Sequence, residues 1–62
     1  MNTLVDVRNK KKLTQREMAQ KIGVTLTLYS KIEIGDRNPS YNFLVKFKKA
    51  FNDVIIDKVF FN

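Results

Sequence analysis

The sequence contains no cysteine and no histidine among its 62 residues. The lack of cysteine excludes disulfides, thiolate metal sites and thiol nucleophiles, and the lack of histidine excludes imidazole acid–base chemistry. No apolar run approaches the roughly 18 residues of a membrane span, and the first residues lack the apolar stretch of a signal peptide. We therefore expect a cytoplasmic protein with no metal, no cofactor, no evident small-molecule ligand and no membrane partner.

Glycine and proline are also scarce, with two glycines and one proline in the whole chain. Repeats, low-complexity tracts and linkers are not found. A chain of this length has room for one domain, which we place over residues 1–62. Its core must be small, so its stability is expected to be marginal, and dimerisation or a bound partner would add to it.

Acidic residues are half as frequent as basic ones, with six Asp and Glu against twelve Lys and Arg, which gives a net charge of +6. This excess favours a polyanionic partner, although many small basic proteins have none. The few carboxylates do not suggest a catalytic pair, since Glu17 has a predicted capping role and the aspartates flank turns or lie in the tail. The sequence therefore predicts a protein that is not an enzyme.

A capping box predicts the start of one helix. Thr14 and Glu17 have the spacing at which the hydroxyl and the carboxylate each bond the other residue's amide, so a helix should begin at Gln15. Gly23 should end it, because glycine adopts the left-handed conformation at a helix end without steric cost. The apolar residues of this segment share one face of the helix, and they are Met18, Ala19 and Ile22.

Similar signals predict the next helix over residues 26–33. Thr25 is its N-cap candidate, and Gly35 should end it. Its apolar side chains fall on one side, whereas Thr27, Ser30 and Lys31 fall on the other. The apolar set consists of Leu28, Tyr29 and Ile32.

The remaining segments predict one helix before this pair and one or two after it. A short helix is expected between Leu4 and Lys12, and a longer one from Ser40 to Asn52. The longer helix has the strongest amphipathic stripe in the chain, formed by Phe43, Leu44, Phe47, Ala50 and Phe51. The tail over residues 54–61 has the composition of a strand, but a lone strand has no partner, so a short fifth helix is favoured. The expected fold is an all-α compact bundle of four to five short helices.

Two short helices joined by a glycine-containing turn form the pattern of a helix-turn-helix, here at the centre of the bundle. The pattern lies in residues 13–25 (LTQREMAQKIGVT), 29–33 (YSKIE) and 35–40 (GDRNPS). These segments resemble the Cro/C1-type phage repressors of the XRE family, loosely over nearly the whole chain. The resemblance implies a lambda repressor-like fold and a transcriptional regulator, more specifically a repressor, that binds double-stranded operator DNA in a bacterial or phage-infected cell.

The resemblance also places residues 25–31 in the major groove of DNA. Base contacts are then expected from Leu26, Thr27, Ser30 and Lys31. Backbone contacts are expected from Arg8, Gln15, Arg16, Thr25, Arg37, Asn38 and Ser40. For Gln15 the position at a helix N-terminus is an independent reason, since free amides and partial positive charge suit a phosphate. For the other polar residues, a merely solvent-exposed face is the alternative.

Two residues depart from the family pattern. The family usually has a polar residue at the position of Leu26, which could instead pack on a thymine methyl or on a neighbouring side chain. It often has glycine at the position of Lys12, so the turn after the first helix is expected to differ. The tail also has one apparent extra residue near Asp53.

An ion pair between Arg8 and Glu33 is a further implication, with the arginine held near a phosphate. An exposed pair contributes only about 0.2 to 1 kcal/mol, so we expect it to position the arginine and not to stabilise the fold. The basic run over residues 8–12 is either a solvated helix end or a DNA contact. A solvated face that enlarges the positive field is the interpretation for Lys46, Lys48 and Lys49.

The aromatic residues leave a second function open. We expect Phe47 and Phe51 in the core, whereas three other phenylalanines, Phe43, Phe60 and Phe61, are candidates for a dimer surface. A homodimer on DNA half-sites about 34 Å apart is expected from the resemblance. Exposure of these three side chains would favour an antitoxin or another protein-interaction module with the same fold. A further alternative is that the chain is part of a longer repressor with a C-terminal domain.

Overall fold

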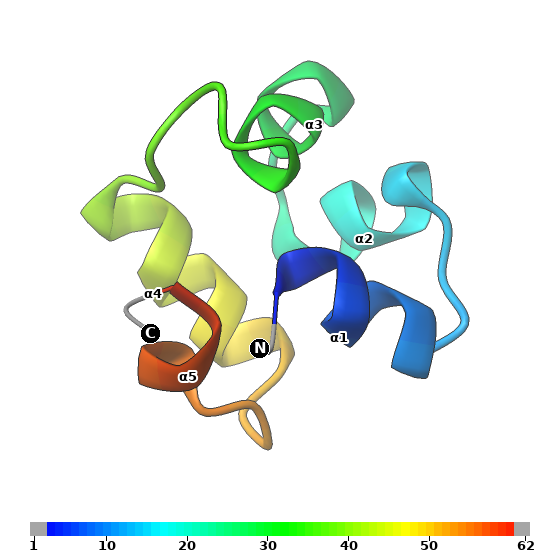
Figure 1. Cartoon of the computed structure of the whole chain (residues 1–62), viewed down its shortest axis with the longest axis vertical. Helices are drawn as coiled ribbons and strands as arrows, with labels where there is room; N and C mark the ends of the chain where they lie inside the picture. Colours follow the sequence, from blue (N-terminus) through cyan, green and yellow to red (C-terminus); the bar gives the residue numbers. More distant parts are fainter. Residues whose placement is uncertain (1–2, 61–62) are drawn as a thin grey trace.

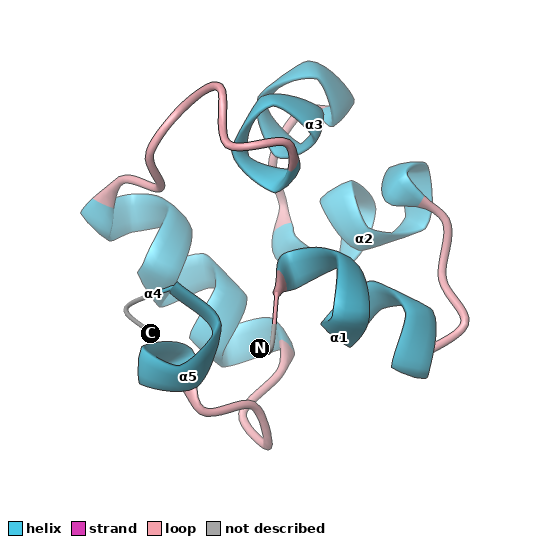
Figure 2. Ribbon diagram, viewed as in Figure 1, coloured by secondary structure: helices cyan, strands magenta, loops and turns pink. Residues whose placement is uncertain are grey.

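The computed structural model describes residues 3–60, which form five helices (Figure 1). The helices are α1 (Leu4–Lys10), α2 (Gln15–Ile22), α3 (Leu26–Glu33), α4 (Tyr41–Ala50) and α5 (Ile56–Phe60). Residues 3–60 contain no strand (Figure 2). The predicted all-helical bundle is therefore confirmed, and the tail forms a short helix up to Phe60.

Hydroxyl side chains begin the first four helices. Thr3, Thr14, Thr25 and Ser40 each accept a hydrogen bond from the backbone N–H three residues further on. At Thr14 the predicted capping box is confirmed, because its backbone N–H donates to the Glu17 carboxylate at 2.8 Å. This backbone bond, with the nearby Thr14 hydroxyl, stabilises the charged carboxylate and lowers the pKa of Glu17.

Helices α1, α2 and α3 are each followed, within two positions, by a residue in the left-handed conformation. These residues are Lys12 (φ 56°), Gly23 (φ 92°) and Gly35 (φ 84°). After α1 the N–H of Lys12 donates to Asn9 at 3.1 Å and that of Leu13 to Arg8 at 3.2 Å, which is a Schellman motif. The same pair of bonds closes α3 around Gly35. The turn after α1 thus has the backbone geometry of a glycine turn, although it contains a lysine.

The core consists of buried apolar side chains from α1 to α4 and from the turn after α4. They are Leu4, Val7, Met18, Ala19, Ile22, Tyr29, Ile32, Phe43, Phe47 and Phe51. Helix α2 packs against both α3 and α4. The prediction that Phe47 and Phe51 are buried is therefore confirmed, and so is the inward face of α2.

The prediction of a dimer surface is wrong for Phe43, which is 1% exposed. Its ring stacks on Phe47 and meets the edge of Phe60, at centroid distances of 6.2 and 6.1 Å. The reason is helical spacing, which aims residues 43 and 47 at the same core. Phe60 is half-buried on these rings, and Phe61 lies outside the described residues. Ala50 is exposed, contrary to the predicted stripe, because the helix ends there and Phe51 fills the core instead.

Candidate nucleic-acid interface

The helix-turn-helix consists of α2, a turn through Gly23 and α3. Tyr29 and Ile32 face the core, and they fix which side of α3 is turned outward. On the outer side Thr27 and Lys31 are exposed. The two other residues predicted to contact bases, Leu26 and Ser30, are half-buried. Because residues 26, 27, 30 and 31 follow helical spacing, they form one side of α3.

The residues predicted to contact the DNA backbone have different surroundings. Five of them are exposed, namely Arg16, Thr25, Arg37, Asn38 and Ser40. Thr25 and Ser40 also cap α3 and α4. Residues 34–40 form the loop that leaves α3 and runs to the start of α4 (Figure 1). The other two, Arg8 and Gln15, are half-buried in a polar network.

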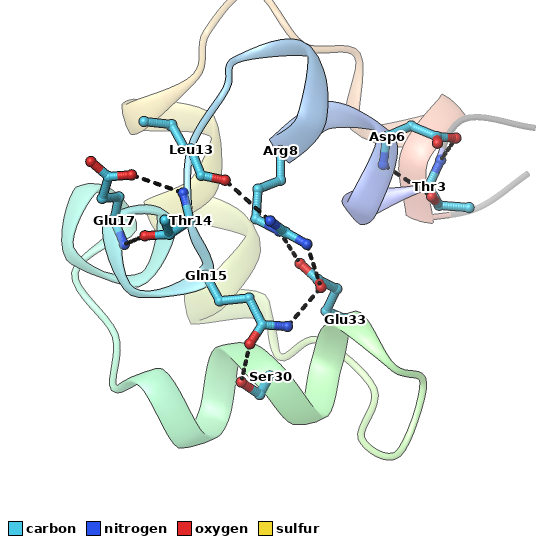
Figure 3. A network of polar contacts seen from close by, with 9 residues as sticks. All are labelled: Thr3, Asp6, Arg8, Leu13, Thr14, Gln15, Glu17, Ser30 and Glu33. Atoms are coloured by element: carbon cyan, nitrogen blue, oxygen red, sulfur yellow. Dashed lines mark hydrogen bonds and ion pairs between the residues drawn. The ribbon is translucent and has the colours of Figure 1, made fainter.

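Arg8 and Glu33 form the predicted ion pair, which joins α1 to the end of α3 (Figure 3). Arg8 Nε donates to Glu33 Oε2 at 2.9 Å, and Nη2 donates to Oε1 at 3.3 Å. Arg8 Nη1 also donates to the carbonyl of Leu13 at 3.1 Å. The side chain of Glu33 is only 3% exposed, and that of Arg8 is 20% exposed. The expectation of an exposed, weak pair is therefore wrong, because the carboxylate is enclosed by side chains that include Arg8 and Gln15 and is shielded from water.

Gln15 extends this network to the outer side of α3 (Figure 3). Its Nε2 donates to Glu33 Oε1 at 2.8 Å, and its Oε1 accepts from the Ser30 hydroxyl at 3.1 Å. Burial alone would raise the pKa of Glu33, but the hydrogen bonds from Arg8 and Gln15 outweigh it and lower the pKa. Two residues predicted to touch DNA are thus bonded to each other inside the protein.

This link between Gln15, Ser30 and Glu33 is not predicted by the sequence pattern. One signal was present, since Ser30 and Glu33 are three residues apart and so lie on the same side of α3. That spacing does not reveal that Gln15 of α2 lies between them. The position of Gln15 depends on the angle at which the two helices pack.

Tyr29 places a polar atom beside the network. Its hydroxyl is buried, and no side chain of residues 3–60 forms a hydrogen bond with it. Burial raises the pKa of the Tyr29 hydroxyl, so it stays neutral at any physiological pH.

The basic residues divide into paired and free groups. Lys11 Nζ lies 3.3 Å from Asp53 Oδ2 and 5.1 Å from the centre of the Phe51 ring. Lys10 and Lys12, its neighbours, are exposed. The basic run over residues 8–12 is therefore neither wholly solvated nor wholly free for DNA, because two of its members bind other parts of the chain.

The lysines of α4 are exposed, as the sequence predicted. Lys48 Nζ donates to the carbonyls of Asn52 and Val54, at 3.1 and 3.2 Å, and so supports the turn that follows the helix. Lys46 Nζ lies 3.5 Å from the carbonyl of Gly23. These lysines therefore have local roles in the fold besides their contribution to the positive field.

Exposed apolar surface is found between α4 and α5, away from Phe43. A hollow of about 410 Å³ is lined there by Tyr41, Leu44, Val45, Lys48, Lys49 and Ile56. Among residues 3–60, no group of three or more Asp and Glu side chains is placed to hold a metal ion. None of the helices in this part of the chain is long and apolar enough to cross a membrane.

Comparison with known proteins gives one family and one relative. A family model described as helix-turn-helix, HTH_3, matches residues 4–55. A protein of Bacillus subtilis (strain 168), named as the uncharacterized HTH-type transcriptional regulator YqaE, is 42% identical over 50 residues. The match covers 81% of this chain and 42% of that relative, so the chain spans less than half of the relative's length. No solved structure gives a significant match.

Proposed function

Because the chain belongs to the XRE-type helix-turn-helix family, we propose that it binds a specific double-stranded DNA operator with α3 in the major groove and represses transcription. The family and the relative support a DNA-binding transcriptional regulator. The observation that carries the finer proposal is the exposed side of α3, where Thr27 and Lys31 face solvent on a helix fixed by Tyr29 and Ile32. An α-helix with such a face fits the major groove, whose base edges carry the donor and acceptor pattern.

The first residues of α2 are suited to hold the protein on the phosphate backbone. The side-chain amide of Gln15 has two N–H groups. One donates to the Glu33 carboxylate, so the other is left for a phosphate oxygen. The exposed Arg16 follows it at the same positive end of the helix. Across the site, Arg37 and Asn38 are exposed in the loop after α3. These contacts would orient α3 without reading sequence.

Arg8 has a different role in this proposal. All of its guanidinium nitrogens bond to Glu33 or to the Leu13 carbonyl. These bonds use three of its five N–H groups, so Arg8 fixes the end of α3 and still has two N–H groups for a phosphate oxygen. A homodimer on two half-sites about 34 Å apart is part of the same proposal and follows from the family resemblance.

Exposed apolar surface around residues 43, 60 and 61 would favour the protein-interaction alternative. Phe43 is buried and Phe60 is half-buried against it, so these two residues do not support that alternative, and Phe61 lies outside the described residues. Repression requires no chemistry by the protein, because a bound dimer excludes polymerase from the operator.

A binding measurement at two salt concentrations tests this proposal. The protein is titrated onto its native upstream region and onto random DNA. We expect a preference of at least about 10³ for the native region and a steep loss of affinity as salt rises. Equal affinity for both DNAs would contradict the proposal, and so would binding that does not respond to salt.

A further inference from the structure

We infer that the Ser30 hydroxyl acts toward a DNA base only as a hydrogen-bond acceptor. It would therefore select a base that offers an exocyclic amine. The inference rests on the proposed function, since it assumes that α3 enters the major groove. It follows from the direction of each hydrogen bond in the chain Glu33–Gln15–Ser30 (Figure 3).

The direction of the first bond is set by the charge on Glu33. Two bonds from Arg8 keep this carboxylate ionised, and an ionised carboxylate only accepts hydrogen bonds. The atom of Gln15 that lies 2.8 Å from Glu33 Oε1 must then be the amide nitrogen. The orientation of the Gln15 amide is therefore fixed, although the two ends of an amide have nearly the same shape.

The direction of the second bond follows. With its nitrogen toward Glu33, Gln15 presents its carbonyl oxygen to Ser30, at 3.1 Å from the hydroxyl. A carbonyl only accepts, so the hydroxyl must donate its single proton. Only the lone pairs of Ser30 Oγ remain for another partner. A phosphate oxygen also only accepts, so Ser30 is excluded as a phosphate ligand.

The major groove offers few donors to such an acceptor. Adenine presents its N6 amine and cytosine its N4 amine, whereas guanine N7 and O6 and thymine O4 only accept. The next residue has the opposite character, because the exposed ammonium of Lys31 only donates. Ser30 and Lys31 would therefore select complementary kinds of base edge at adjoining places in the groove.

The test couples a change in the protein with a change in the DNA. Operator sites are selected from random DNA by the unaltered protein and by Ser30→Ala, and the base pair at which their preferences differ is assigned to Ser30. At that pair, one DNA analogue lacks the exocyclic amine and another has carbon in place of purine N7. We expect amine removal to weaken binding of the unaltered protein by about three- to tenfold more than binding of Ser30→Ala. The carbon analogue should affect both proteins equally.

A second variant, Gln15→Met, has a side chain of similar shape and frees the Ser30 proton. We expect it to become sensitive to the loss of purine N7, because the hydroxyl can then donate. Lys49→Ala, on an exposed face of α4, serves as the matched control and should keep every preference of the unaltered protein.

Three results would overturn the inference. One is that loss of purine N7 weakens binding of the unaltered protein more than binding of Ser30→Ala. The others are that Ser30→Ala changes the preference at no base pair of an otherwise specific site, and that Gln15→Met keeps every base preference of the unaltered protein. If Gln15→Met does not fold, Ser30→Ala still decides, because this change leaves the bonds of Glu33 to Arg8 and Gln15 in place. An unaltered protein without any sequence preference would instead refute the proposed function.

Discussion

Helices α1–α3 and helices α4–α5 differ in the contacts that they add to the shared apolar core. In the first region Arg8 and Gln15 donate directional hydrogen bonds to the buried carboxylate of Glu33, and Ser30 donates one to Gln15. In the second region the rings of Phe43, Phe47, Phe51 and Phe60 pack with centroid distances of 5.3 to 6.2 Å. Ring packing contributes much stability but tolerates small shifts, whereas hydrogen bonds fix orientation. The directional contacts of this chain are therefore concentrated where α2 and α3 meet, and they fix the orientation of α3.

The largest expected effect is in the aromatic region. Phe47 is fully buried and contacts three other rings. Phe47→Ala should lower the free energy of unfolding by about 3–5 kcal/mol, because it leaves a cavity in a small core. Thermal unfolding followed by circular dichroism measures this loss. A loss below about 1 kcal/mol would show that the aromatic region does not dominate stability.

The second effect is in the polar region. Glu33→Gln removes the charge that pairs with Arg8 and should cost about 2–3 kcal/mol, less than a fully buried pair because Arg8 is 20% exposed. DNA specificity should fall as well, since α3 loses its attachment to α1. Thermal unfolding and the preference for native over random DNA measure the two effects. If stability falls but specificity is unchanged, the network does not set the angle of α3.

The same pair predicts a pH dependence. The folded pKa of Glu33 lies below its ordinary value of 4.5, so the stability from its charge is present above pH 4.5 and is lost as pH falls through the lowered pKa. Glu33→Gln should therefore differ most from the unaltered protein above pH 4.5, and the two should converge in acid. Urea unfolding at a series of pH values tests this, and a constant difference at all pH values would contradict it.

A third, smaller effect distinguishes a lysine of α3 from a lysine of α4 in DNA binding. Lys31→Ala removes an exposed cation from α3, and Lys48→Ala removes one from α4. We expect Lys31→Ala to change sequence preference by about 1 kcal/mol, whereas Lys48→Ala should weaken binding to all DNA alike or not at all. Site selection from random DNA compares them. Equal effects of the two changes would refute the proposed orientation of α3.

The smallest effect is a gain in stability. Lys12 has a φ of 56°, where a side chain is strained, and it is exposed. Lys12→Gly should raise the free energy of unfolding by about 0.5–1 kcal/mol, because relief of strain exceeds the added freedom of the unfolded chain. Lys10→Gly, also exposed but inside α1, is the matched control and should destabilise the protein by a similar amount. Urea unfolding of both variants measures the difference.

Local signals in the sequence predicted much of the fold. The Thr14–Glu17 capping box and Gly23 fix both ends of α2 through residues at most four positions apart, so no tertiary information is needed. The Arg8–Glu33 pair came from the family resemblance, and its burial was not predicted. The link from Gln15 to Ser30 depends on how α2 and α3 pack, and spacing alone does not specify that angle.

Contacts of long range have no local signal in the sequence. Helical spacing places Phe43 on the same side of α4 as Phe47, but it does not predict that α5 brings Phe60 onto the Phe43 ring. Lys11 meets Asp53 across 42 positions in the chain, so its pairing has no local signal either. For the residues predicted to contact DNA, the structure gives exposure and hydrogen bonds, and their roles stay predictions.

The strained backbone at Lys12 links the stability of the protein to its positive charge. Replacement by glycine at this one exposed position would relieve the strain, yet the chain keeps a cation there. Its proposed partner carries one negative charge about every 1.7 Å along the duplex. Under the proposed function, Lys12→Gly removes one of the charges that attract this duplex, so the variant with the more stable fold should bind DNA less strongly.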